Sequence, residues 1–226
     1  MIRIENVEVM GWKLAIRGMR NPMNSWEKSD SGYCMNTFAC HTCKENRNNC
    51  KKNIDSHKLI IGSNDLDLMK RLRNAGTDHR KFMRMITVYV DITAPLYWWK
   101  EFDTYKVGTV ANSCSTMHKI HAREFTLEDF SHEHLFAPLQ DLRPLIDILN
   151  MYREMYLETK DKQDWWQLIQ LLPTSYNQKR TVMLNYEVLA NMYKSRKDHK
   201  LDEWREFCKW IETLPYSFLI TGEETE

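Results

Sequence analysis

The side chains best suited to chemistry lie in one polar segment, residues 103–118. This segment is rich in threonine and serine, and it follows a strand-like run and an aromatic, helix-like run. Gly108 would let the backbone approach a ligand closely, and Asn112, Ser113 and Ser115 offer hydrogen-bonding side chains. The composition suits binding of a phosphate or a nucleobase. The alternative is a polar surface loop whose side chains only cap neighbouring elements.

A second candidate pair is Asn185 and Arg196. They lie eleven residues apart in a segment that we expect to be helical. Eleven residues are about three turns of an α-helix, so both side chains would share one face, roughly 16 Å apart along the axis. Two polar groups at that spacing could contact opposite ends of a nucleotide. The alternative is an asparagine that caps the helix and an arginine that faces solvent.

Four of the six cysteines form a third cluster, in residues 33–57, which we interpret as an insertion or mobile loop. They are Cys34, Cys40, Cys43 and Cys50. Cys-x2-Cys is half of a structural zinc site, but the flanking spacings match no standard zinc finger. The sequence therefore leaves two hypotheses open, a zinc ion that staples the insertion and a set of reduced thiols without metal.

Several reaction classes lack their motifs. The sequence has no Walker A loop, no Gly-x-Gly-x-x-Gly and no Gly-x-Ser-x-Gly. His79 stands alone before the clearest strand-like run. A histidine can transfer protons near neutral pH, although a lone histidine is more often structural.

The composition is that of a globular protein, with 42% hydrophobic and 28% charged residues in 226. Lys and Arg (32) nearly balance Asp and Glu (31), and a net charge of +1 disfavours a protein that grips a long nucleic acid. No apolar run reaches the roughly 20 residues that span a bilayer, and the N-terminus has no apolar leader. We therefore expect no membrane partner and a cytoplasmic location.

The hydrophobic pattern predicts a single α+β domain over residues 1–226, with a mixed or antiparallel sheet and a helical C-terminal half. Strands are expected near residues 2–9, 86–93 and 181–184. Helices are expected from residue 12, after Ser63 or Asn64, and at 96–102, 139–158, 162–171, 185–197 and 201–213. Residues 104–117 are expected to form a loop.

The order and spacing of these features resemble the flavin-dependent thymidylate synthases. In that family an acidic residue and a histidine precede a strand, here Asp78-His79, and a helix then leads into an Arg-His-Arg-x-x-Ser loop. With Asp103-Thr104-Tyr105 at the Arg-His-Arg position, Ser113 falls on the serine eight residues after that triplet. The C-terminal pattern continues through Leu172-Pro173, Thr181 and Asn185-Tyr186-Glu187-Val188-Leu189, and Arg196 keeps its eleven-residue interval.

The resemblance implies a site that binds FAD and deoxyuridylate (dUMP) at a subunit interface of a homotetramer. It implies that Arg196 grips the nucleotide phosphate, that Ser113 and Ser115 lie near the nucleotide, and that Ser113 and His79 are the catalytic candidates. The cofactor-binding residues implied by it are Asn185, His79, Lys106 and Asn112. The reaction would be methylation of dUMP, in which flavin carries the redox chemistry.

The chain also departs from the family pattern. Asp103-Thr104-Tyr105 replaces the Arg-His-Arg triplet, Ser115 replaces a further arginine, and Glu187 replaces the arginine two residues after the asparagine. A hydrogen bond to a charged group contributes about 1.5–3 kcal/mol, so these losses weaken phosphate binding. Two hypotheses follow, a divergent nucleotide-binding member of the family, and a non-catalytic nucleotide-binding or protein-interaction module that kept only the scaffold.

Overall fold

The structure is a computed structural model that describes residues 2–33 and 59–222. The chain forms two compact units, one of Met1–Val9 with Thr87–Glu226 and the other of Met10–Ile86. Each unit is described separately below. The expected insertion at 33–57 lies outside the described residues except for Tyr33, and the single domain over 1–226 stays a prediction.

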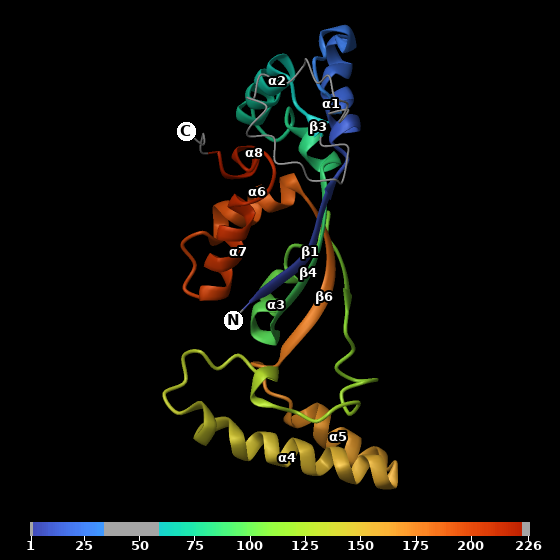
Figure 1. The fold of residues 1–226 in the computed structure, drawn as a ribbon, viewed down its shortest axis with the longest axis vertical. Coiled ribbons are helices and arrows are strands. Elements are labelled where there is room, and N and C mark those ends of the chain that lie inside the picture. Colours follow the sequence, from blue (N-terminus) through green and yellow to red (C-terminus); the bar gives the residue numbers. More distant parts are fainter. Residues whose placement is uncertain (1, 34–58, 223–226) are drawn as a thin grey trace, which may run out of the picture. The chain divides into compact units, whose positions relative to one another are not determined.

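A four-stranded sheet organises the first unit, with strand order β1-β4-β6-β5. The strands are β1 (Arg3–Met10), β4 (Thr87–Pro95), β5 (Val110–Ser113) and β6 (Asn177–Asn185). β4 and β6 run antiparallel along their whole length, from Thr87 opposite Asn185 to Pro95 opposite Asn177, and lie side by side in Figure 1. Val88, Val90 and Ile92 are fully buried on one face, as the alternating pattern predicts.

Helices make up most of the C-terminal half of this unit, as predicted. They are α3 (Leu96–Phe102), α4 (Pro138–Thr159), α5 (Lys162–Leu171), α6 (Tyr186–Arg196), α7 (Asp202–Glu212) and α8 (Phe218–Thr221), with a short 3-10 turn at Leu127–Asp129. Pro144 lies inside α4, which continues through it. α4 and α5 pack together at one end of β6 (Figure 1) around a small core that includes Ile146, Leu149 and Leu168.

An aromatic cluster joins α3 to α7 in the main core. It consists of Trp98, Trp99, Phe102, Trp204 and Phe207, each no more than 2% exposed. The ring centroids of Trp98 and Trp204 lie 4.7 Å apart, and those of Trp98 and Trp99 lie 4.9 Å apart at a steep angle. Such pairs stabilise beyond the burial of their area, by about 0.5–1.5 kcal/mol each. The cluster therefore fixes the position of α3, which carries several polar groups of the candidate site.

The second unit contains two helices, a short hairpin and several 3-10 turns. Its elements are α1 (Trp12–Arg20), α2 (Ser63–Asn74), β2 (Gly32–Tyr33), β3 (Leu59–Ile60) and turns at Asn21–Met23, Trp26–Lys28 and Lys81–Met85. Asp65 is completely buried and accepts from Arg20 Nε at 2.6 Å and from the hydroxyls of Ser29 and Ser31. Burial alone would raise the pKa of Asp65, but hydrogen bonds from Ser31, Ser29 and Arg20 outweigh it and lower the pKa.

Three local predictions were wrong. The expected loop at 104–117 contains strand β5, whose residues are all exposed and so lack an apolar alternation. β6 begins at Asn177, four residues before the predicted strand. Neither Ser63 nor Asn64 caps α2, because the Asp30 carboxylate accepts from the backbone N–H of Asn64 at 2.9 Å, and the N-cap residue is Gly62.

Candidate functional site

Arg196, the predicted phosphate ligand, is the last residue of α6 and lies against the aromatic cluster. Its Nη1 forms an ion pair with Glu101 Oε2 at 2.6 Å, and its Nε donates to the Tyr105 hydroxyl at 2.9 Å. Its guanidinium carbon lies 4.8 Å from the ring centroid of Trp204. The side chain is 19% exposed. Arg196 is therefore held in one orientation by an acid, a phenol and an indole ring.

Glu101, on α3, is the centre of this arrangement. One carboxylate oxygen, Oε2, accepts from Arg196 Nη1, from Trp204 Nε1 at 3.0 Å, and lies 3.3 Å from His199 Nε2. The carboxylate therefore joins α3, α6, α7 and the turn that precedes α7. Its negative charge also neutralises the arginine that the sequence predicts as a phosphate ligand.

A second arginine, Arg180 on β6, packs on the aromatic cluster at Trp99, whereas Arg196 packs on it at Trp204. Its guanidinium carbon is 4.2 Å from the ring centroid of Trp99, its Nη1 pairs with Asp103 Oδ1 at 2.7 Å, and its Nε donates to Gln178 Oε1 at 2.9 Å. The Arg180 side chain is only 14% exposed, whereas that of Asp103 is 50% exposed. Asp103, which the resemblance aligns with the first position of the Arg-His-Arg triplet, therefore pairs with a cation of strand β6.

Ser113 and Arg180 are direct neighbours on adjacent strands of the sheet. Ser113 is the last residue of β5 and pairs directly with Arg180 on β6, so both side chains project from the same face. Asn112 pairs with Thr181, and because side chains alternate along a strand it projects from the opposite face. The structure therefore brings Ser113 to the arginine and separates Asn112 from both.

Asn185 and Ser115 both have local structural partners. Asn185 is the N-cap of α6, and its Oδ1 accepts from the backbone N–H of Val188 at 3.0 Å. Ser115 Oγ accepts from the backbone N–H groups of Met117 and His118, at 3.1 and 2.9 Å. These bonds match the structural alternatives stated for both residues, and ligand roles for them stay predictions.

Site roles for the remaining predicted residues stay predictions. Lys106 is exposed in the turn after α3, and His79 is exposed in the second unit. The four cysteines of the zinc hypothesis, Cys34, Cys40, Cys43 and Cys50, lie outside the described residues. Residues 2–33 and 59–222 contain no group of three histidine, cysteine or acidic side chains that could hold a metal. The zinc hypothesis at the four cysteines stays a prediction.

Sequence reasoning missed Arg180 and Glu101. Arg180 lies just before the strand expected at 181–184, and no motif singles it out. Glu101 was read as one polar residue of an aromatic helix. Their opposite charges give no periodic signal in the sequence, and only the antiparallel register brings Arg180 to the end of α3.

The four charged groups form two ion pairs, so the formal charges of Arg180, Arg196, Glu101 and Asp103 sum to zero. Each arginine uses Nε and Nη1 for these contacts, and its Nη2 group forms no hydrogen bond with a residue that the structure describes. The site can therefore donate planar, oriented hydrogen bonds to carbonyl or phosphate oxygens. With no net charge from these four groups, the site attracts an anion through oriented hydrogen bonds and not through overall charge.

Comparisons with known proteins support the fold. No protein-family model matches the sequence, and no curated protein matches it significantly. A flavin-dependent thymidylate synthase (ThyX) from Helicobacter pylori, solved with FAD and dUMP, has a TM-score of 0.64 at 16% identity, over 96% of this chain and 99% of that chain. A second such structure at 2.31 Å resolution gives 0.63 at 15%, over 98% of each chain.

A third structure extends the likeness to another methylase. The UMP/dUMP methylase PolB from Streptomyces cacaoi, bound to 5-Br dUMP, has a TM-score of 0.55 at 14% identity, over 94% of this chain and 89% of that chain. At these identities the likeness establishes the fold alone.

In this chain, no helix of the described residues is both long enough and apolar enough to cross a bilayer.

Proposed function

We propose that this protein binds a uridylate-type nucleotide at the cluster of Arg180, Arg196 and Ser113. Arg196 contacts the phosphate, and Arg180 with Ser113 contacts the pyrimidine ring. A uracil ring offers two carbonyl acceptors and one N–H donor, which a guanidinium and a hydroxyl can match. Nucleotide binding by the structurally similar thymidylate synthase and dUMP methylase supports this choice of ligand.

The observation that carries the proposal is the fixed orientation of both arginines. Each guanidinium is clamped by a carboxylate at 2.6 or 2.7 Å and lies against a tryptophan ring, so its remaining donors point in one direction before a ligand arrives. Donors that are already oriented lose less side-chain entropy on binding. Arginines kept only for solubility would instead be exposed and free to move.

FAD fits the described residues less well than a nucleotide monophosphate. The phosphates of FAD and of dUMP carry similar total charge, so the difference lies in the contacts: Asp103 places negative charge where the resemblance puts an arginine of the cofactor cradle. The charges of Asp103 and Glu101 already match those of the two arginines. We therefore derive no reaction step through flavin. Methylation of dUMP would require flavin binding. We also propose that the protein forms a homotetramer with its nucleotide sites at the subunit interfaces.

A thermal-shift titration with dUMP tests the binding. At a ligand concentration of 100 times Kd, binding stabilises the native state by about 2.7 kcal/mol, which raises the melting temperature by several degrees. Arg196→Gln and Arg180→Gln should each abolish most of that rise. The matched control is Arg143→Gln, which removes an exposed arginine that pairs with Asp147 on α4. If wild type shows no rise, or if both site variants keep it, the proposal fails.

The second candidate is a non-catalytic module that kept only the scaffold. It is favoured by the pairing of each arginine with a carboxylate of its own chain. A visible spectrum of the purified protein separates enzyme from binder, because bound flavin absorbs near ~450 nm and carries the redox chemistry. A colourless protein that binds dUMP would be a nucleotide binder, and one that binds neither would be the scaffold alone.

A further inference from the structure

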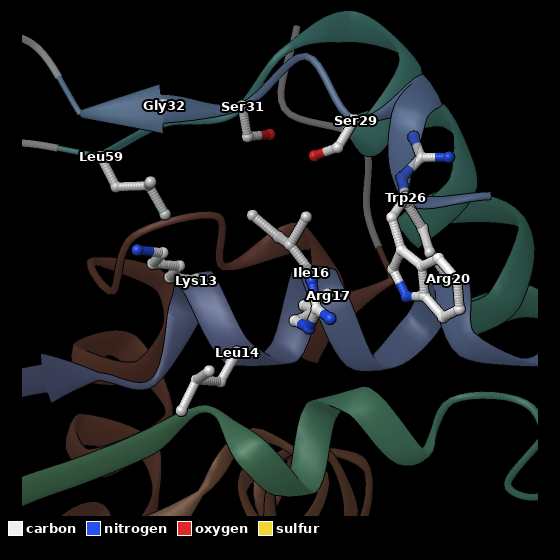
Figure 2. Close-up of a pocket in the computed structure, with 10 residues that line it drawn as sticks. All are labelled: Lys13, Leu14, Ile16, Arg17, Arg20, Trp26, Ser29, Ser31, Gly32 and Leu59. Atoms are coloured by element: carbon white, nitrogen blue, oxygen red, sulfur yellow. The ribbon is translucent and has the colours of Figure 1, made fainter. Parts of the chain in front are cut away.

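The second unit contains a pocket that takes no part in the proposed function. It has a volume of about 210 Å³ and lies between α1 and the segment that runs from Trp26 to Gly32, as Figure 2 shows. Its apolar lining comes from Leu14, Ile16, Leu59 and the Trp26 indole. The volume is below the roughly 300–1,000 Å³ of drug-sized sites, so the pocket suits a molecule of one or two rings.

Three cations line this pocket, and only one of them has an acidic partner. Arg20 is buried and pairs with Asp65 at 2.6 Å. Lys13 and Arg17 project from exposed positions of α1 and form no ion pair with any residue that the structure describes. Arg17 contacts the Trp26 ring instead, with its guanidinium carbon 5.6 Å from the centroid. The pocket therefore has two cations that pair with no acidic side chain among the described residues, beside an apolar wall.

The shape of the pocket is maintained by contacts independent of any ligand. Trp26 Nε1 donates to Asn21 Oδ1 at 2.8 Å, which fixes the plane of the indole. The hydroxyls of Ser29 and Ser31 donate to the buried carboxylate of Asp65, at 2.7 and 2.6 Å, which holds the rest of the segment from Trp26 to Gly32 in place. Ile16 projects towards this segment (Figure 2) and is only 4% exposed.

We propose that this pocket binds a small aromatic anion, with its ring against Trp26 and Ile16 and its carboxylate or sulfonate between Lys13 and Arg17. Apolar surface favours burial of the ring, and the cations favour the anionic form over a neutral molecule of equal shape. Stacking against an indole adds to this preference for an aromatic body. The site lies within the second unit and does not depend on nucleotide binding by the first.

The test is isothermal titration calorimetry of the full chain with 2-naphthoate and with its neutral isostere, 2-naphthamide. We expect saturable binding of 2-naphthoate and at least tenfold weaker binding of the amide. The double variant Lys13→Gln/Arg17→Gln should bind 2-naphthoate at least tenfold more weakly than wild type, because it loses both charged contacts. The matched control Lys28→Gln removes an exposed lysine that does not line the pocket, and it should leave the affinity unchanged.

Three results would overturn the proposal: no saturable binding of 2-naphthoate, equal affinity for the acid and the amide, or full affinity in the double variant. Circular dichroism melts show whether each variant is folded, and both substituted side chains are exposed, so folding should be unaffected. The dUMP thermal shift of the double variant should match that of wild type. That comparison separates failure of this pocket from failure of the nucleotide site.

Discussion

At the scale of single residues, Glu101 has the most influence on the proposed site. It accepts from Arg196 and Trp204 through one oxygen and lies within 3.3 Å of His199. The same carboxylate orients the arginine and opposes the phosphate that the arginine would bind, because like charges repel. Replacing Glu101 with glutamine separates the orienting effect from the repulsion, because the side-chain amide keeps an acceptor oxygen and loses the charge.

We predict that Glu101→Gln tightens dUMP binding about tenfold, since the amide oxygen still accepts from Arg196 while the repulsion is removed. Calorimetric titration of dUMP measures the change. Glu206→Gln on α7, which removes an exposed acid paired with Lys209, is the control and should have no effect. Weaker binding in Glu101→Gln would mean that the negative charge is needed to orient Arg196.

At the scale of elements, strand β6 divides its polar groups between two faces of the sheet. Arg180 lies with the aromatic cluster on one face, and Thr181 lies on the other, where its hydroxyl donates to Asp91 Oδ1 at 2.6 Å. Asp91 also accepts from Asn6 at 2.9 Å and pairs with Lys179 at 3.1 Å. These contacts lower the pKa of Asp91 to about 2, with the Thr181 hydrogen bond as the largest cause.

A depressed carboxyl pKa makes stability depend on acid pH. Above the ordinary value of 3.8 the ionised Asp91 stabilises the sheet fully, and this contribution is lost as the pH falls towards 2. We predict that Thr181→Val raises the pKa of Asp91 towards 3.8, as measured by an NMR titration of its side-chain carboxyl carbon. Thr93→Val, on the same face of β4, is the control. An unchanged pKa in Thr181→Val would assign the shift to Asn6 and Lys179.

The turn between α3 and β5 packs tightly on the start of α6. Gly108 has φ of +80°, and a Cβ there would lie 2.9 Å from Asn185 Nδ2 and 3.0 Å from Val188 Cγ2. Gly76 also has a positive φ, +104°, but a Cβ there would meet nothing within 4 Å. Alanine substitutions at the two glycines therefore separate the cost of a positive φ from the cost of a close side-chain contact.

We predict that Gly108→Ala lowers the free energy of unfolding by about 2 kcal/mol, and Gly76→Ala by about 1 kcal/mol, since both place a side chain at positive φ and only the first adds a close contact. Urea denaturation followed by circular dichroism measures both. If both variants lose the same free energy of unfolding, the Asn185 side chain can move away from the new methyl group without cost.

At the scale of the whole molecule, helix α4 exposes a row of apolar side chains. Ile148, Met151 and Met155 are each more than 40% exposed, and their spacing of three and four residues places them on one face of the helix. Exposed apolar rows of this kind are typical of protein interfaces. The resemblance to a homotetrameric family favours a second copy of this chain as the partner.

We predict that light scattering after gel filtration gives four times the chain mass of 27.2 kDa, and that Met155→Glu lowers this mass by placing a charge in the interface. Glu154→Gln, at an exposed neighbouring position, should leave the mass unchanged. If the wild-type chain elutes as a monomer, the proposal of nucleotide sites at subunit interfaces loses its support.

The sequence alone determined the class of fold and most of the helices and strands, because hydrophobic periodicity is a local property. Val88, Val90 and Ile92 alternate as the sheet requires, and the C-terminal helices lie close to their predicted ranges. It also singled out Arg196 and Ser113, whose roles as nucleotide ligands stay predictions. Both predictions depend on spacing along the chain, which folding preserves.

Only the tertiary structure decided which groups surround those residues. Glu101 and Arg196 are 95 residues apart, and Asp103 and Arg180 are 77 apart, so no local pattern pairs them. Strand β5 was missed because its four exposed residues are held by hydrogen bonds to β6 and not by apolar burial. The balance of charge at the site therefore follows from two tertiary contacts: strand β6 brings Arg180 to Asp103, and helix α6 brings Arg196 to Glu101 on α3.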